Sequence, residues 1–238
     1  MSKADLPGTS LFAADTIGRR AFLVGGGAAL VAGCTTVDPQ STVEVGATRI
    51  PSHYLAMYGP RPDERFPIPA VDLATINPAY LRQEVANPTG EAPGTIVVDT
   101  GNFVLYWTME GGRAMRYGVG LGREGFSWDG SATIARKAAW PVWTPPAEMI
   151  AREPELEKYR NGMEPGLGNP LGARALYLYQ DGRDTLYRLH GTQEAYSIGR
   201  AVSSGCVRLL NQDIIDLYER VPRGTRVIVR SPASPIVG

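Results

Sequence analysis

The sequence is poor in cysteine, in histidine and in net charge. Among 238 residues it has two cysteines and two histidines, and 24 acidic residues balance 24 basic ones. A balanced charge gives no general attraction to nucleic acid or to an anionic membrane. The cysteines and histidines show no recognisable metal-ligand spacing, so we expect no metal site. No Gly-x-Ser-x-Gly motif occurs, so serine hydrolase chemistry lacks its usual nucleophile.

Glycine and proline, by contrast, are plentiful, at 28 and 19 residues. This composition is unusual for a helical protein and typical of a turn-rich β fold. The cluster Gly120–Gly125 satisfies the G-x-G-x-x-G pattern of dinucleotide-binding loops. That mechanism needs a helix directly after the loop, and Phe126–Gly130 has turn chemistry instead. We therefore expect a loop there, and no cofactor.

Residues 1–34 predict an export signal. The pair Arg19-Arg20 precedes the apolar run Ala21–Gly33, as in twin-arginine signals. A helix of that length rises about 20 Å, too short for a hydrocarbon core of about 30 Å. The run ends in small residues before Cys34, which resembles a lipobox. We expect a protein of the periplasm or cell envelope, held to the membrane only by a lipid on Cys34. A cleaved signal with an incidental cysteine is the alternative.

Removal of that signal leaves Cys206 as the one cysteine of the mature protein. In an oxidising compartment such a thiol is either a buried structural residue or a reactive one. His190 lies sixteen residues earlier, close enough to meet Cys206 across adjacent strands. Histidine is the usual base that activates a thiol. A redox role is disfavoured, because no second mature cysteine stands at C-x-x-C spacing.

After the signal we expect a proline-rich tether and arm over 35–93, a catalytic domain over 94–230 and a tail over 231–238. The arm contains one predicted short helix, Pro78–Val85, with proline in its first turn. Its apolar residues are expected to pack on the domain rather than to bind a partner: Tyr54, Met57, Tyr58, Phe66, Ile68 and Leu73.

The domain alternates strand patterns with turn residues. A helix is predicted at Asn211–Val221, with Asn211 as its N-cap and one apolar stripe that packs behind the active site. Strands are predicted at Thr95–Asp99, Asn102–Thr108, Ala114–Val119, Leu176–Tyr179, Thr185–His190 and Gly224–Val229.

The stretch Trp140–Arg174 has few strand signals and several prolines and glycines. Long irregular segments in compact domains are commonly lids or binding loops. We interpret it as a flap beside the cleft, with a short helix at Ala147–Arg152 and with Trp140 and Trp143 as walls. The alternative is that both tryptophans belong to the core.

The residues around His190 and Cys206 resemble the L,D-transpeptidase catalytic domain, the YkuD family. That family has a His-Gly segment followed, somewhat over a dozen residues later, by a Ser-Gly-Cys motif, as in His190-Gly191 and Ser204-Gly205-Cys206. Ser204 departs from the histidine of many members. The resemblance implies a mainly β domain, a sandwich or barrel with a short helix in its C-terminal region and an irregular flap. It runs from about Gly94 to Val229, through Gly94–Val98, Tyr117–Gly120, Lys137, Trp140–Trp143, Pro145-Pro146, Asn169–Ala173, Ser197–Gly199, Asn211 and Asp213.

The pair predicts two-step acyl transfer. Cys206 attacks a peptide carbonyl as a thiolate, and His190 takes the thiol proton and returns it to the leaving amine. The backbone N–H groups of Ser204, Gly205 and Cys206 are candidates for holding the oxyanion, because glycine permits the tight turn that aims them. The resemblance implies that the carbonyl of Gly191 orients the histidine.

Other residues are candidates for substrate binding. Arg208 has forked donors that suit a carboxylate, with a structural salt bridge as the alternative. Trp140, Ser203 and Thr192 are further candidates around the cleft.

The resemblance also implies the substrate, the tetrapeptide stem of peptidoglycan. The acyl group would pass to the side-chain amine of a second stem and give a 3→3 cross-link, in peptidoglycan synthesis and cell-wall organisation. Three alternatives stay open. Water as acceptor would make an L,D-carboxypeptidase or endopeptidase, a lipoprotein could supply the amine, and a degenerate site would leave a non-catalytic wall-binding module.

Overall fold

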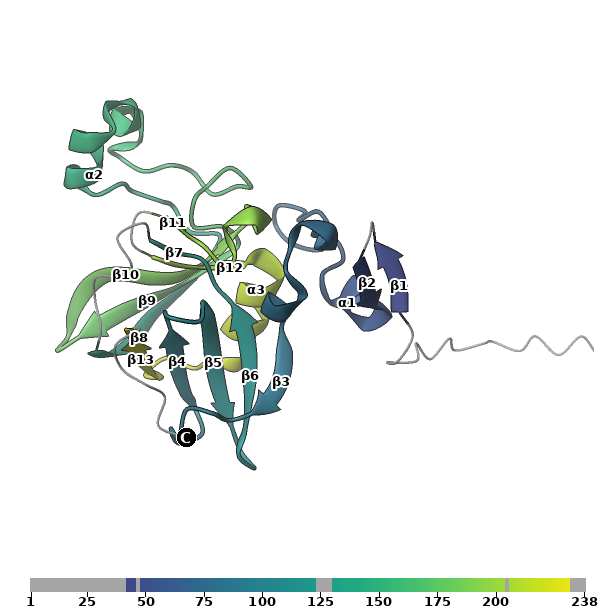
Figure 1. Ribbon diagram of the computed structural model, residues 1–238. Helices are drawn as coiled ribbons and strands as arrows, with labels where there is room; N and C mark the ends of the chain where they lie inside the picture. The colour runs from purple at the N-terminus through teal and green to yellow at the C-terminus, as the bar shows by residue number, and fades with distance from the viewer. Residues whose placement is uncertain (1–41, 46–47, 123–129, 204–205, 232–238) are drawn as a thin grey trace, which may run out of the picture. The chain divides into compact units, whose positions relative to one another are not determined.

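A mixed nine-stranded β-sheet forms the framework of the protein (Figure 1). The computed structural model describes residues 42–45, 48–122, 130–203 and 206–231. The signal with Cys34, residues Ser204 and Gly205, the second half of the glycine cluster and most of the tail lie outside the described residues. In spatial order the sheet contains β12 (Val207–Leu210), β10 (Arg183–Thr192), β9 (Arg174–Gln180), β8 (Gly130–Ala139), β13 (Arg226–Arg230), β4 (Thr95–Asp99), β5 (Val104–Met109), β6 (Arg113–Gly118) and β3 (Gln83–Ala86).

Smaller elements surround this sheet. Two further pairs of strands are β1 (Thr42–Val45) with β2 (Thr48–Pro51), and β7 (Leu121–Gly122) with β11 (Ala201–Ser203). The α-helices are α1 (Ser52–Met57), α2 (Ala147–Arg152) and α3 (Asn211–Arg220). The 3-10 helices are η1 (Leu73–Thr75), η2 (Pro78–Tyr80), η3 (Pro154–Tyr159) and η4 (Ala195–Ser197). No helix within the described ranges is long and apolar enough to cross a membrane.

Strand β4 lies inside the sheet, and its five residues are all buried. It pairs antiparallel with β5 and parallel with β13, so both of its edges are bonded. The other parallel pair described within the nine-stranded sheet is β10 with β12. The predicted hairpins β4–β5 and β9–β10 are confirmed. In the second, Asp181 and Gly182 have φ of 50° and 75°, the positive values that a type I′ hairpin turn requires.

The sheet folds back on itself at Gly120, shortly after the end of β6 at Gly118. The N–H and C=O of Gly120 bond the C=O and N–H of Arg208 in β12, each at 2.9 Å. Strands from both ends of the sheet therefore share one core with α3, and the predicted mainly β fold is confirmed. Core side chains include Ile96, Leu105, Tyr117, Ile134, Leu176, Leu189, Leu209, Ile214 and Leu217.

Helix α3 packs against β9, β10 and β12, at the back of the strands that carry His190 and Cys206. Its apolar stripe is confirmed, but the prediction of Asn211 as N-cap is wrong. Leu210 holds the N-cap position, and the Asn211 side chain accepts a hydrogen bond from the backbone of Ala173 at 2.9 Å. At the other end Lys137 of β8 donates to the carbonyls of Tyr218 and Val221, both at 2.6 Å. A cation there complements the negative end of the helix.

The arm packs on the domain, as expected. Tyr58 and Leu73 join a buried cluster with Ile198 and Leu210, while Ile68 packs in a second buried cluster. Several elements of the arm were predicted wrongly or missed, β1 and β2 among them. Helix α1 was not expected, and the segment Pro78–Val85 is η2 followed by the edge strand β3 instead of one helix.

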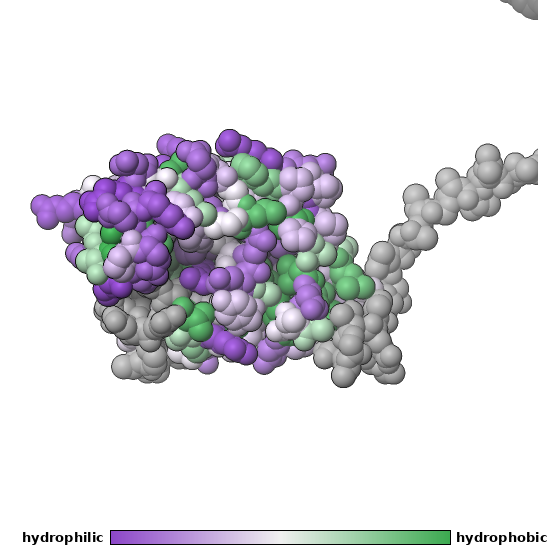
Figure 2. All heavy atoms as spheres, turned by 90° about the horizontal axis from the view of Figure 1, so that it is seen from above, coloured by the Kyte–Doolittle hydropathy of each residue, from purple (hydrophilic) through white to green (hydrophobic). Residues whose placement is uncertain are grey.

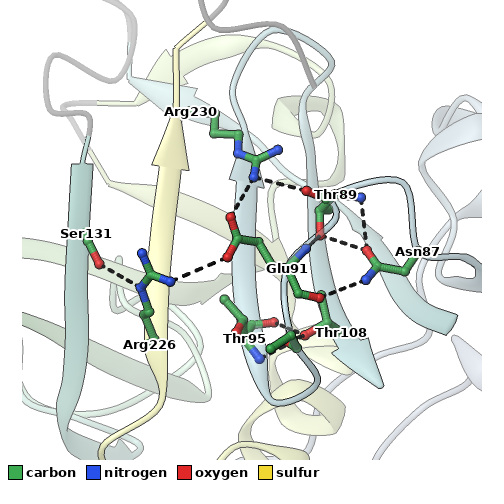
Figure 3. Close-up of polar contacts among 9 residues, drawn as sticks. Asn87, Thr89, Glu91, Thr95, Thr108, Ser131, Arg226 and Arg230 are labelled. Carbon is green, nitrogen blue, oxygen red and sulfur yellow. Dashed lines mark hydrogen bonds and ion pairs between the residues drawn. The ribbon is translucent and has the colours of Figure 1, made fainter. Parts of the chain in front are cut away.

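A polar network joins the end of the arm to β13 (Figure 3). The carboxylate of Glu91 accepts from Arg230 at 2.8 Å and from Arg226 at 3.4 Å. Arg230 also donates to the carbonyl of Thr89, and Arg226 donates to the hydroxyl of Ser131 in β8. These contacts fix the chain just before it enters β4.

Candidate active site

His190 lies on β10, and Cys206 directly precedes β12, the parallel strand beside it. In the pairing of β10 with β12, Leu189 stands opposite Val207 and His190 opposite Arg208. Cys206 directly precedes β12 and therefore comes beside Arg188 of β10. Both His190 and Cys206 line a cleft of about 870 Å³. The structure thus brings together the two residues that the sequence singled out, across adjacent strands as expected.

The orientation of His190 is set by its own neighbour. The ring is almost fully buried, and Nδ1 lies 2.9 Å from the carbonyl oxygen of Gly191. A carbonyl can only accept, so Nδ1 carries the proton and Nε2 is left with a free lone pair. Burial lowers the pKa of His190 to about 4. The nearby charges of Arg208 and Arg188 act in the same direction, against the hydrogen bond to Gly191. The imidazole is therefore neutral at physiological pH and can act as a base.

The thiol of Cys206 is protonated at rest. Burial raises its pKa, although a backbone hydrogen bond from Arg188 and the charges of Arg188 and Arg208 favour the thiolate. The residue as a whole is partly exposed. Neutral thiol and neutral imidazole therefore coexist, and the two guanidinium groups favour negative charge on the sulfur once the proton leaves.

A bulge in β10 shapes the cleft beside the thiol. The register with β9 shifts between Asp184 and Arg188, and within the bulge Leu186 has a φ of 64°. The Asp184 carboxylate accepts from the N–H of Leu186, and the Thr185 hydroxyl accepts from the N–H of Tyr187. Leu186 is 63% exposed, and its carbonyl oxygen lies 4.0 Å from the Cys206 sulfur. This bulge was not predicted from the sequence, although Asp and Thr in succession are typical turn-forming residues.

The other predicted binding residues differ in their placement. Arg208 lines the cleft, and its guanidinium pairs with Glu194 at 2.5 Å, which is the salt bridge of the alternative; its binding of a substrate carboxylate stays a prediction. Thr192 is buried and accepts from the N–H of Glu194 at 3.1 Å, away from the cleft lining. Ser203 pairs with Gly122 through β11 and β7.

The predicted flap does line the cleft, and α2 has the predicted bounds. Trp143 lies in the lining, and its backbone forms a two-way bridge with Met163. Asn169 is buried, and its amide nitrogen donates to the carbonyls of Pro141, Met163 and Glu164, each at 3.1 Å. Figure 2 looks onto the side that carries α2 and η3, where hydrophilic residues predominate and hydrophobic ones are scattered between them.

The expectation that Trp140 forms a wall of the cleft is wrong. Trp140 is 5% exposed and packs with Ile68, Ala173 and Ile215. Its indole nitrogen donates to Glu64 at 2.9 Å. A buried tryptophan needs such a partner for its N–H, and here the arm supplies it.

A protein-family model matches the part of the chain that contains this cleft. The model of the YkuD family, the L,D-transpeptidase catalytic domain, matches residues 93–229. The chain belongs to the YkuD family. Two curated relatives are a probable L,D-transpeptidase, YbiS, of Escherichia coli K12 and a putative L,D-transpeptidase of Fuscovulum blasticum. The first is 40% identical over 144 residues, 56% of this chain and 43% of the relative. The second is 37% identical over 137 residues, 56% of this chain and 68% of the relative.

A solved structure is also similar in sequence. It is a crystal structure from Brucella melitensis, described as a probable carnitine operon oxidoreductase. The identity is 45%, with 66% of this chain and 98% of that chain covered and a TM-score of 0.47. The chain spans less than half the length of the E. coli relative.

Proposed function

We propose that the protein is a peptidoglycan L,D-transpeptidase that works through an acyl-enzyme on Cys206. The observation that supports this most is the neutral His190, fixed by the Gly191 carbonyl and lining the same cleft as the Cys206 thiol. Membership of the YkuD family supplies the reaction class. A cysteine activated by an oriented histidine is a general device for acyl transfer.

In the first half-reaction His190 Nε2 takes the thiol proton and the sulfur attacks the carbonyl carbon of the donor peptide. The tetrahedral intermediate collapses as His190 returns this proton to the leaving amine, which frees a terminal D-amino acid and leaves a thioester. Arg188 and Arg208 stabilise the sulfur while it is negative. We assign the oxyanion to the N–H groups of Ser204, Gly205 and Cys206, the first two of which lie outside the described residues.

In the second half-reaction the side-chain amine of a second stem attacks the thioester. Its proton passes to His190, and the thiol is restored as the 3→3 cross-link forms. Water is the competing acceptor, and it would yield a carboxypeptidase or endopeptidase. An amine is favoured by the relatives, which carry the name of L,D-transpeptidases. The amine of a lipoprotein is an equivalent nucleophile.

The substrate also determines the location that we propose. Residues 1–34 serve as a twin-arginine signal, Cys34 carries the lipid, 35–93 form the tether and arm, and 94–230 act on the cell wall in the periplasm. Replacing Cys34 with alanine should release the protein from membranes, whereas replacing Arg19 and Arg20 with lysine should block export. Unchanged membrane fractionation of Cys34→Ala would contradict the lipidation.

The enzymatic proposal is tested by mass spectrometry with purified tetrapeptide stems. The wild type should give 3→3 linked dimers and a thioester adduct of one acyl group per chain. Cys206→Ser should give neither, because a hydroxyl ionises far less readily than a thiol. His190→Gln should reduce the rate by about 10²–10⁴-fold, as expected for loss of a general base. Cross-linking by Cys206→Ser would overturn the assignment, and release of monomeric tripeptides alone would identify a hydrolase.

A further inference from the structure

Arg136, Tyr177, Arg188 and Cys206 form a row that crosses the sheet toward the thiol. The register places Arg136 of β8 opposite Tyr177 of β9, and Tyr177 opposite Arg188 of β10. The pairing of Leu189 with Val207 then puts Cys206 beside Arg188. All four residues line the cleft.

Arg136 reaches this row because β8 contains a bulge. Ile134 pairs with Leu178, and both side chains are buried in the core. Without the bulge Ala135 would stand opposite Tyr177. The register shift between Ile134 and Arg136 puts Arg136 there instead, on the face away from the core. Bulges commonly redirect a side chain in this way beside active sites.

Both guanidinium groups pack on the same aromatic ring. The Cζ atom of Arg136 lies 4.3 Å from the centroid of Tyr177, and that of Arg188 lies 4.5 Å from it. Such stacking holds the planar group in a defined orientation. The two cations differ in their partners. Arg188 pairs with Asp184 at 2.7 Å, whereas Arg136 is exposed and has no carboxylate partner among the described residues.

We propose that Arg136 is a specificity-determining residue that binds a free carboxylate of the peptide substrate. A guanidinium that is stacked, oriented and without a carboxylate partner in the described part of the chain matches the forked geometry of that group. Three strand spacings of about 4.8 Å separate the backbones of Arg136 and Cys206 by about 14 Å. An extended peptide covers that distance in about four residues. The recognised carboxylate therefore lies up to about four residues from the reacting carbonyl.

This inference rests on the proposed function for the identity of the peptide, and its test separates the two. Two forms of the stem tetrapeptide are prepared. In one all carboxylates are free, and in the other the carboxylates outside the reacting residue are amidated. Binding is measured by calorimetry to Cys206→Ala, which cannot react, and to Cys206→Ala with Arg136→Gln. Arg183→Gln is the matched control, because Arg183 is an exposed arginine at the start of β10 outside the cleft lining.

The Cys206→Ala protein should bind the free-carboxylate peptide about tenfold more tightly than the amidated one, as expected for one charged hydrogen-bonded pair. Arg136→Gln should remove that preference, and Arg183→Gln should keep it. Arg136→Lys should keep only part of it, since lysine retains the charge and loses the fork. An equal affinity for both peptides in the parent, or an unchanged preference in Arg136→Gln, would overturn the proposal. Thioester formation in otherwise wild-type protein reports separately on the acyl-transfer function.

Discussion

The side-chain oxygen of Asn211 occupies the space beside Gly191 where any other residue would carry its Cβ. A Cβ at Gly191 would lie 2.2 Å from Asn211 Oδ1 and 3.1 Å from the nitrogen of Ala173. That nitrogen is itself the donor to Asn211 Oδ1. Three parts of the structure therefore pack in direct contact: the start of α3, the chain that enters β9 and the carbonyl that orients His190.

Replacing Gly191 with alanine should damage catalysis more than stability. The new methyl group must displace either Asn211, which breaks its bond to Ala173, or the Gly191 carbonyl, which turns His190. A misplacement of about 1 Å in a catalytic group can cost about 10²-fold in rate. We expect a loss of that order in the rate of thioester formation, measured by quenched reactions and intact-mass spectrometry. The melting temperature should fall by several degrees, as expected for a single domain of this size.

The matched control for this change is Gly166→Ala in the flap. A Cβ there meets no atom within 4 Å, so rate and melting temperature should stay close to those of the wild type. If Gly191→Ala reacts as fast as Gly166→Ala, the carbonyl of residue 191 does not control the histidine.

The rate of thioester formation should resist acid unusually well. An unperturbed histidine loses its base form below about pH 6.5, whereas the pKa of His190 is lowered to about 4. We expect kcat/KM to change little between pH 7 and about pH 5.5 and to fall only near pH 4. Circular dichroism at each pH separates loss of the base from unfolding. An acid limb centred near 6.5 would mean that His190 is exposed to water in the working enzyme.

The lowered pKa of His190 also makes the stability of the protein depend on pH. Between about pH 4 and 6.5 the unfolded chain binds a proton at residue 190 that the native protein does not bind. The contribution of neutral His190 to the free energy of unfolding is therefore complete above about pH 6.5. It is lost as the pH falls through 4.

The raised pKa of Asp213 predicts that stability changes with pH in the opposite direction. This carboxyl group is fully buried, accepts from the Tyr58 hydroxyl at 3.1 Å and lies 3.7 Å from the Arg82 guanidinium. Burial raises its pKa to about 7, against the effect of Arg82. The native state thus keeps a proton that the unfolded chain releases near pH 4, and stability is lost as the pH rises through 7.

Asp213→Asn, which cannot titrate, should therefore show a smaller fall in melting temperature between pH 5 and pH 8 than the wild type. The exposed Asp63→Asn serves as the control and should follow the wild type. Parallel curves for Asp213→Asn and the wild type would show that Asp213 is ionised in the native state.

Much of the fold could be predicted because the relevant signals are local. The turn residues between β9 and β10, the apolar stripe of α3 and the bounds of α2 each lie within a few residues of the element that they define. The adjacency of His190 and Cys206 was predicted from their closeness in sequence, although β10 and β12 are parallel and the connection between them contains η4 and β11.

What escaped prediction depends on distant partners or on interrupted patterns. Strand β8 was missed because it has few apolar residues and because a bulge breaks its alternation at Arg136. Trp140 was misplaced because Glu64, its partner, lies 76 residues away in the arm. The stack on Tyr177 needs the register of three strands, which no sequence pattern reveals.

Asn169 should control the order of the flap. Its amide donates to three carbonyls, and its Oδ1 accepts from the N–H of Leu171 at 2.9 Å. Asn169→Ala leaves these buried groups without that hydrogen-bond partner. Each group left unsatisfied lowers the free energy of unfolding by about 1–3 kcal/mol. Hydrogen exchange should accelerate across residues 141–170, and KM should rise more than kcat falls. Unchanged exchange there would show that water replaces the lost amide.

The bond between Gly120 and Arg208 has a consequence for how a peptide can approach. Many proteins that capture extended peptides add them as one more strand at an open sheet edge. Beside the thiol that route is closed, because the outward N–H and C=O of Arg208 are both bonded to Gly120. A substrate must instead lie across the strands, over their side chains. Recognition then depends on the chemical groups that the peptide carries, and its backbone alone gives the enzyme little to read.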